Sequence, residues 1–146
     1  MQCSTSRFGL IEVRDQDVVR FPAGLVGLED CQDWALLADQ RSGSIAWLQS
    51  LERPDVALPV TSPRRFVPSY QVRVARRELT PLDLNEADTA EVLVVVGGAK
   101  GELTLNLKAP LVVNVRRGLG RQVITRGDLP VRFSLEASPS AVRRIA

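Results

Sequence analysis

Apolar and polar residues alternate along short stretches of this chain, as they do in strands that bury one face. Strict alternation runs from Leu103 to Lys108, and the same pattern recurs over Gln71–Val74. Further stretches are rich in β-branched, aliphatic or aromatic residues, which favour strands. They are Phe8–Val13, Val18–Phe21, Ala46–Leu51, Ala57–Val60, Val92–Val96, Leu111–Val115, Gln122–Thr125 and Val131–Leu135. The pattern therefore predicts roughly nine or ten short strands.

Glycine, proline and small polar residues separate these stretches at close intervals. The turn-forming strings are Pro22–Gly24, Arg41–Ser44, Arg53–Asp55, Gly97-Gly98 and Gly118–Gly120. Such short connections leave little room for crossover helices, so we expect a mainly antiparallel sheet. The fold class that follows is all-β: a small, closed or nearly closed barrel, with a sandwich as the alternative.

Helix is expected at only two places. Glu29–Leu37 is predicted to form one or two turns, because the acidic residues at its start suit the helix dipole. Ser62–Phe66 is predicted to begin another turn, with Ser62 as the N-cap and Pro63 at the first helical position. Neither segment is long enough to organise the fold.

The length of 146 residues corresponds to about one domain. We expect residues 1–136 to form it and residues 137–146, which hold few core-forming side chains, to fray. The N-terminal residues lack the basic and apolar regions of a secretory signal. The longest dense apolar run, Val92–Val96, is far shorter than the ~18 residues that a membrane helix needs. The sequence predicts a cytoplasmic protein that does not bind membranes and is monomeric when free.

Candidate catalytic chemistry is sparse, because the chain contains no histidine. This removes Ser-His-Asp and Cys-His catalysis and metal sites that depend on imidazole. The only thiols, Cys3 and Cys31, form no C-x-x-C pair, and a disulfide between them is left open. Two groups of carboxylates could supply acid/base chemistry: Glu12, Asp15 and Asp17, and Glu29, Asp30 and Asp33. Solvated or capping roles account for both groups, so we expect no catalytic residue, no cofactor and no metal.

The formal net charge of +2 is too close to neutral to indicate nucleic-acid binding by itself. Gly97–Gly101 resembles a phosphate loop, but an alternating strand rather than a helix follows it, which favours a hairpin. The basic loop of Arg116, Arg117 and Arg121 is either an exposed hairpin tip or, together with Tyr70, a nucleic-acid site. Six of the seven aromatic residues precede residue 71, which favours the hairpin tip.

Specific strings, rather than periodicity, point to a family. They stand in order over roughly residues 7–126, and their joint occurrence is far more specific than any one of them. They are Arg7–Val13, Phe21–Leu25, Gly27–Asp30, Trp47–Glu52, Pro54-Asp55, Pro63 with Phe66, Pro68 and Tyr70, Glu78-Leu79, Asn106–Asn114 and Gly120–Ile124. On these strings the chain resembles the flagellar assembly factor family, FliW.

The resemblance implies a small, mostly antiparallel β-barrel-like protein without catalytic activity. It further implies two protein partners and no direct contact with nucleic acid. One partner is the RNA-binding regulator CsrA, bound away from its RNA surface so that repression of flagellin translation is relieved. The other is flagellin, which competes with CsrA for the same protein in a chaperone-like interaction.

Some positions depart from the family pattern. Ser62 and Ser69 stand where the family generally has Asp, which would weaken any charged contact made there. Pro59 replaces an apolar strand residue and, lacking an N–H, should mark a strand edge or a bulge. The polar residues within the family strings are the candidate partner-binding residues, and we expect them to be exposed. They are Gln49, Ser50, Tyr70, Asn106 and Asn114.

Overall fold

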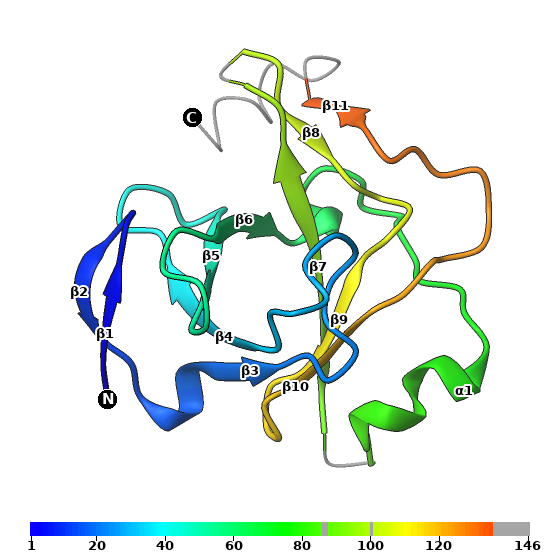
Figure 1. The fold of residues 1–146 in the computed structure, drawn as a ribbon. Helices are drawn as coiled ribbons and strands as arrows, with labels where there is room; N and C mark the ends of the chain where they lie inside the picture. The colour runs from blue at the N-terminus through cyan, green and yellow to red at the C-terminus, as the bar shows by residue number, and fades with distance from the viewer. Residues whose placement is uncertain (86–87, 100, 136–146) are drawn as a thin grey trace.

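Seven strands follow one another around a closed barrel in the computed structural model, which describes residues 1–85, 88–99 and 101–135 (Figure 1). The order around the barrel is β7, β6, β5, β4, β3, β10 and β9, and β9 pairs back onto β7. The strands are β3 (Val18–Arg20), β4 (Asp33–Ala38), β5 (Ala46–Ser50), β6 (Ala57–Thr61), β7 (Ala90–Gly97), β9 (Leu111–Asn114) and β10 (Leu119–Gln122). The all-β barrel predicted from the sequence is confirmed.

Strand β7 closes the barrel because it pairs with three different strands along its length. Its first half, Ala90–Leu93, is antiparallel to β9, and Val94 and Val95 pair with β6. Its end pairs with β8 (Thr104–Leu105), which lies outside the barrel. Every neighbouring pair is antiparallel except β3 and β10, whose single parallel register position joins Arg20 to Leu119.

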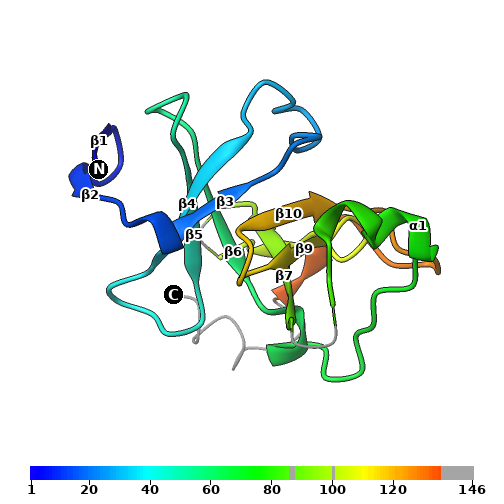
Figure 2. The same ribbon diagram turned by 90° about the horizontal axis from the view of Figure 1, so that it is seen from below.

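Smaller elements surround the barrel. A separate hairpin of β1 (Gln2–Thr5) and β2 (Gly9–Glu12) stands at one side, away from α1 (Arg76–Leu79), in both views (Figure 1 and Figure 2). Strand β11 (Phe133–Ser134) extends the sheet beyond β8. The remaining helical turns are η1 (Asp15–Asp17), η2 (Pro63–Arg65) and η3 (Thr80–Leu82). Across the described parts of the chain, none of the helices has the length and apolar character needed to cross a membrane.

The barrel interior is filled by large apolar side chains, of which Phe21 and Trp34 are fully buried. The indole N–H of Trp34 donates to the carbonyl of Cys31 at 3.1 Å, so its one polar atom is satisfied inside the core. Gly120 on β10 lies against Phe21: a Cβ at this position would come within 2.5 Å of the ring. The absence of a side chain at Gly120 is therefore what lets the Phe21 ring occupy this part of the core.

Two predicted segments differ from the structure. Glu29–Leu37 is not a helix, because Asp33–Ala38 is strand β4, held between β3 and β5. Gln71–Val74 is not a strand, although Arg73 exchanges hydrogen bonds with the neighbouring segment at Thr125 and Arg126. In both cases the pairing available in the folded chain, rather than local pattern, decides the conformation.

Other predicted elements are shifted or were missed. The strand expected at Gln122–Thr125 lies earlier, as β10, because the turn at Gly118 lets the chain pair with β9 directly after it. Strand β1 was not predicted, since its sequence shows no apolar alternation. The hairpin expected at Gly97–Gly101 is confirmed by the pairing of β7 with β8, while Lys100 and the tail 137–146 lie outside the described residues.

Two proline expectations hold. Pro59 lies opposite Trp47 of β5, and β7 pairs only with the next two residues, Val60 and Thr61. The proline therefore marks the end of the β6–β7 ladder, where its missing N–H is tolerated. Pro63 begins the turn η2 after Ser62, although the Ser62 hydroxyl makes no capping hydrogen bond.

Candidate partner-binding surfaces

Gln49 and Ser50 lie at the end of β5 and are fully buried. The Gln49 amide donates to the carbonyls of Ser50, Pro54 and Val56 at 3.0, 3.2 and 3.1 Å. The Ser50 hydroxyl accepts from the backbone N–H groups of Glu52 and Arg53, the second and third residues after the strand. The expected exposure of Gln49 and Ser50 is wrong, because both side chains hold the turn between β5 and β6 together.

Asn114 at the end of β9 is likewise buried, which is contrary to the exposure expected of it. Its amide donates to the carbonyl of Leu82 at 3.0 Å and to the carboxylate of Asp88 at 3.1 Å. The Asp88 side chain is 0% exposed and also pairs with Arg116 at 3.3 Å and Arg117 at 3.5 Å. Burial works to raise the pKa of Asp88, but hydrogen bonds from Asn114, the Asn85 N–H and Arg117, with the charge of Arg116, hold that pKa below its ordinary value.

The arginine loop considered for nucleic-acid binding is occupied by carboxylates of the same chain. Arg116 and Arg117 face Asp88, and Arg117 also pairs with Asp83 at 3.1 Å. Arg121 pairs with Glu78 on α1 at 3.2 Å. These arginines connect the β9–β10 hairpin to the segment that holds α1 and η3. Arg116 and Arg117 lie in the turn of the predicted hairpin, and both pair with carboxylates of the same chain.

Tyr70 is 4% exposed, so the expectation that its polar tip reaches the surface is wrong. Its hydroxyl donates to the carbonyl of Leu107 at 2.7 Å, and its ring packs in an apolar cluster with Val94 and Leu105. Burial raises the pKa of Tyr70 to about 12. A phenol in this position cannot serve as a stacking platform or as a direct partner contact.

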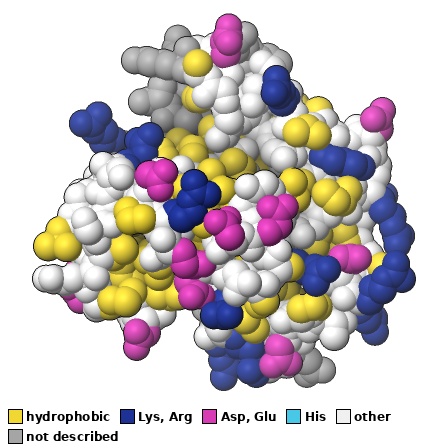
Figure 3. Space-filling model, in the orientation of Figure 1, with side chains coloured by type: hydrophobic (Ala, Val, Ile, Leu, Met, Phe, Trp, Pro, Cys, Tyr) yellow, Lys and Arg dark blue, Asp and Glu magenta, His cyan; other side chains and the backbone are white. Residues whose placement is uncertain are grey.

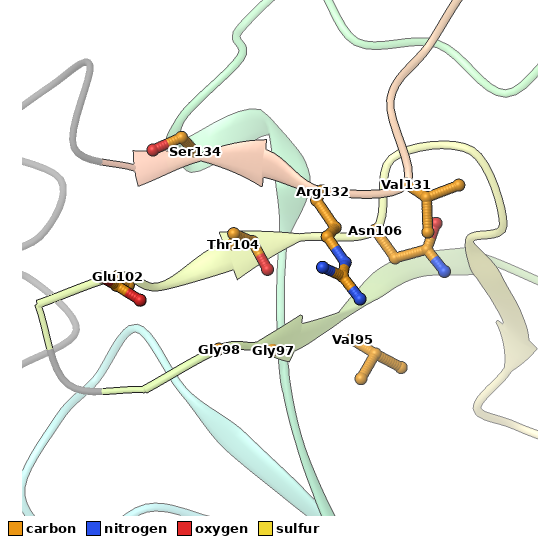
Figure 4. A pocket seen from close by; sticks show the side chains of 9 residues that line it. All are labelled: Val95, Gly97, Gly98, Glu102, Thr104, Asn106, Val131, Arg132 and Ser134. Atoms are coloured by element: carbon orange, nitrogen blue, oxygen red, sulfur yellow. The ribbon is translucent and has the colours of Figure 1, made fainter.

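Asn106 is half-buried and lines a surface hollow, whereas the other four candidates are buried. Its side-chain oxygen accepts from the Ala109 N–H at 3.1 Å, which makes it the anchor of a turn. The hollow, of about 520 Å³, lies on the outer face of β7, β8 and β11. The Arg132 side chain reaches from just before β11 across this face, with Thr104 on one side and Asn106 on the other (Figure 4).

A second hollow, of about 870 Å³, lies between the β1–β2 hairpin and the barrel. We call it the aromatic groove and define it by five of its lining residues: Arg7, Phe8, Ile11, Leu37 and Trp47. Phe8 meets Trp47 edge-on with ring centroids 5.7 Å apart, and the Arg7 guanidinium lies 4.3 Å from the Trp47 centroid. Sequence reasoning missed this surface because the hairpin and β5 come together only in the folded chain.

The floor of the aromatic groove is fixed by a hydrogen bond. The Trp47 indole N–H donates to the Asp39 carboxylate at 3.1 Å. That bond, with the backbone N–H groups of Arg41 and Ser42, holds the pKa of Asp39 below its ordinary value even though Asp39 is half-buried. The indole is thereby held in one orientation while part of its ring remains accessible.

Two of the carboxylates considered for catalysis form ion pairs with different arginines. Asp17 pairs with Arg14 at 3.1 Å, and Asp33 pairs with Arg20 at 3.3 Å. Among the residues that the structure describes, no group of three or more metal-binding side chains comes together. Cys3 and Cys31 are both free thiols, so the disulfide left open by the sequence is not formed.

The family model described as FliW protein matches residues 2–135 of the chain. The chain belongs to the FliW family. The flagellar assembly factor FliW of Bdellovibrio bacteriovorus is 38% identical over 135 residues, covering 90% of this chain and 77% of that protein. That of Natranaerobius thermophilus is 32% identical over 127 residues, covering 85% and 84%.

A crystal structure of the flagellar assembly factor FliW shares the fold. It superposes with a TM-score of 0.85 at 27% sequence identity, covering 92% of this chain and 96% of that one. The family resemblance found in the sequence strings is therefore confirmed in both sequence and fold.

Proposed function

We propose that this FliW family member works by binding proteins rather than by catalysis. It binds CsrA away from the RNA surface of that regulator and relieves repression of flagellin translation, and flagellin competes for it. The match of the family model to residues 2–135 is the observation that supports this role. Such a role places the protein in the cytoplasm, where translation occurs.

The aromatic groove is the surface we propose for partner contact. Trp and Arg are the residue types that most often dominate binding energy at protein interfaces, and here Trp47 and Arg7 are stacked beside Phe8. The hydrogen bond to Asp39 keeps the Trp47 ring in place before a partner arrives, which lowers the entropy cost of binding.

Gel filtration tests the proposed role. The purified chain is run alone, with CsrA from the same organism and with flagellin from the same organism, each at micromolar concentration. We expect co-elution with each partner, and added flagellin should displace CsrA. The proposal is wrong if the chain co-elutes with neither protein.

A further inference from the structure

Two segments distant in sequence lie side by side on the face that carries α1. The Arg73 N–H donates to the Thr125 hydroxyl at 2.8 Å, and the Arg126 N–H donates to the Arg73 carbonyl at 2.8 Å. These backbone contacts bring the side chains of Arg73 and Arg126 to the same part of the surface. Lys108 lies beside the second of these segments, since its ammonium donates to the carbonyl of Gly127 at 2.7 Å.

Two neighbouring hollows lie along these segments, and Arg126 lines both of them. One, of about 440 Å³, has Arg73 in its lining, and the other, of about 280 Å³, has Arg77. The second hollow also has Ile124 in its lining, beside the half-buried Val74. We call these two hollows together the basic groove and define it by Arg73, Val74, Arg77, Ile124 and Arg126.

Two acidic residues line the basic groove, Asp128 in the first hollow and Glu78 in the second, but neither pairs with its three arginines. Within the described part of the chain, none of them takes part in an ion pair, whereas Arg121 beside them is paired with Glu78. Residues 56–77, which include Arg73 and Arg77, contain no acidic residue. Figure 3 shows Lys and Arg side chains gathered along the right-hand edge of the molecule, beside the segment that leads to α1.

An apolar side chain lies among these charges. Ile124 is 61% exposed, although it lies two residues after the barrel strand β10 and its neighbours Val123 and Thr125 are buried. An exposed branched side chain that shares a hollow with Arg77 and Arg126 matches a partner segment in which carboxylates alternate with an aliphatic residue. Arginine forks bind carboxylates through paired, charge-assisted hydrogen bonds.

We propose that the basic groove binds an acidic peptide segment of a partner protein. Carboxylates of the peptide engage Arg73, Arg77 and Arg126, and an aliphatic side chain packs on Ile124. A peptide is favoured over single-stranded RNA because bases stack on exposed aromatic rings. Among the residues lining the two hollows the one aromatic ring is that of Tyr70, which is buried. This site is separate from the aromatic groove and does not depend on the function proposed for it.

Fluorescence anisotropy with three labelled probes tests the proposal. The first is a peptide of about twelve residues in which glutamates alternate with leucines, the second has glutamine in place of each glutamate, and the third is oligouridylate of similar length. We expect the acidic peptide to bind at micromolar concentration, and the glutamine peptide and the oligouridylate to bind at least about tenfold more weakly. Added salt should weaken the interaction.

Charge-reversal variants locate the site. Arg73→Glu and Arg126→Glu should each weaken binding of the acidic peptide about tenfold or more, because each removes one partner and adds a repulsive charge. Ser69→Asp places a carboxylate in the lining of the first hollow and should weaken binding without truncating any side chain of the groove. Arg132→Glu is the matched control, since Arg132 is exposed and lines the hollow on β7, β8 and β11, outside both grooves.

The outcomes are decisive in either direction. Loss of binding in the groove variants, with Arg132→Glu unchanged, supports the proposal. Equal binding in all four variants, equal binding of the glutamine peptide, or tighter binding of oligouridylate overturns it. Co-elution with CsrA is measured on the same variants, so that failure of the basic groove is distinguished from failure of the proposed function.

Discussion

Asn114 donates a hydrogen bond of 3.1 Å to the carboxylate of Asp88, and this contact joins the end of barrel strand β9 to the segment that follows η3. The same carboxylate receives Arg116 and Arg117 from the hairpin tip. Asp88 thus adds to the contacts between these two chain segments that Asp83 and the Leu82 carbonyl also make.

Replacing Asp88 by Asn should lower the melting temperature by several degrees at neutral pH, as measured by circular dichroism. The substitution removes the charge that Arg116 and Arg117 face inside the network. Asp83→Asn is the control, because Asp83 is 70% exposed and its ion pair contributes little. Equal melting temperatures for wild type and Asp88→Asn would contradict the assigned role.

The Asp88 contribution should also depend on pH in a definite direction. Because the pKa of Asp88 is lowered in the folded protein, its stabilisation is present above the ordinary aspartate pKa of about 4. It is lost as the pH falls through the folded-state value. The difference in melting temperature between wild type and Asp88→Asn should therefore be large at pH 7 and shrink progressively below about pH 4.

Tyr70 allows a clean titration because it is the only tyrosine in the chain. With its pKa raised to about 12, the folded protein should show almost no tyrosinate absorbance at pH 10. The unfolded protein in guanidinium should titrate near pH 10, which serves as the control. The Tyr70 contribution to stability is complete below pH 10 and is lost as the pH rises from there to about 12. A folded-state titration near pH 10 would mean that the hydroxyl is not enclosed.

Gly120→Ala should destabilise the barrel by about 1–3 kcal/mol, because the added Cβ forces the buried Phe21 ring from its place. Chemical denaturation measures the free energy of unfolding. Gly43→Ala is the matched control, since a Cβ there meets nothing within 4 Å. If both variants lost the same free energy, the general effect of replacing glycine, rather than the Phe21 contact, would be responsible.

The aromatic groove can be tested by two neighbours on the same strand. Ile11 lies in the lining of the groove, whereas the next residue back, Leu10, is 66% exposed and is not part of the lining. Ile11→Ser should weaken binding to CsrA and flagellin about tenfold, and Leu10→Ser should leave it nearly unchanged. Phe8→Ala provides a second groove variant, and thermal melting shows whether the hairpin still docks. If Leu10→Ser weakened binding more than Ile11→Ser did, the partner contact would lie on the opposite face of strand β2.

Local sequence predicts the elements that depend on near neighbours. The alternation from Leu103 to Lys108 and the glycines before it indicated the β7–β8 hairpin, since such a turn needs only a few residues. The acidic start of Glu29–Leu37 indicated a helix, yet this segment supplies β4 because strands on both sides satisfy its backbone groups. Polar side chains in the family strings indicated a surface, but Gln49 and Asn114 bind backbone groups and carboxylates of the interior.

By itself the sequence determined the all-β class, the family and the absence of histidine chemistry, because these follow from composition, short-range pattern and ordered strings. Only the tertiary structure decided which surfaces exist. The aromatic groove requires Arg7 and Phe8 to meet Trp47, and the basic groove requires Arg73 to meet Arg126. The physical reason is that pairing between distant segments sets which side chains meet carboxylates or backbone inside the fold and which remain free at the surface.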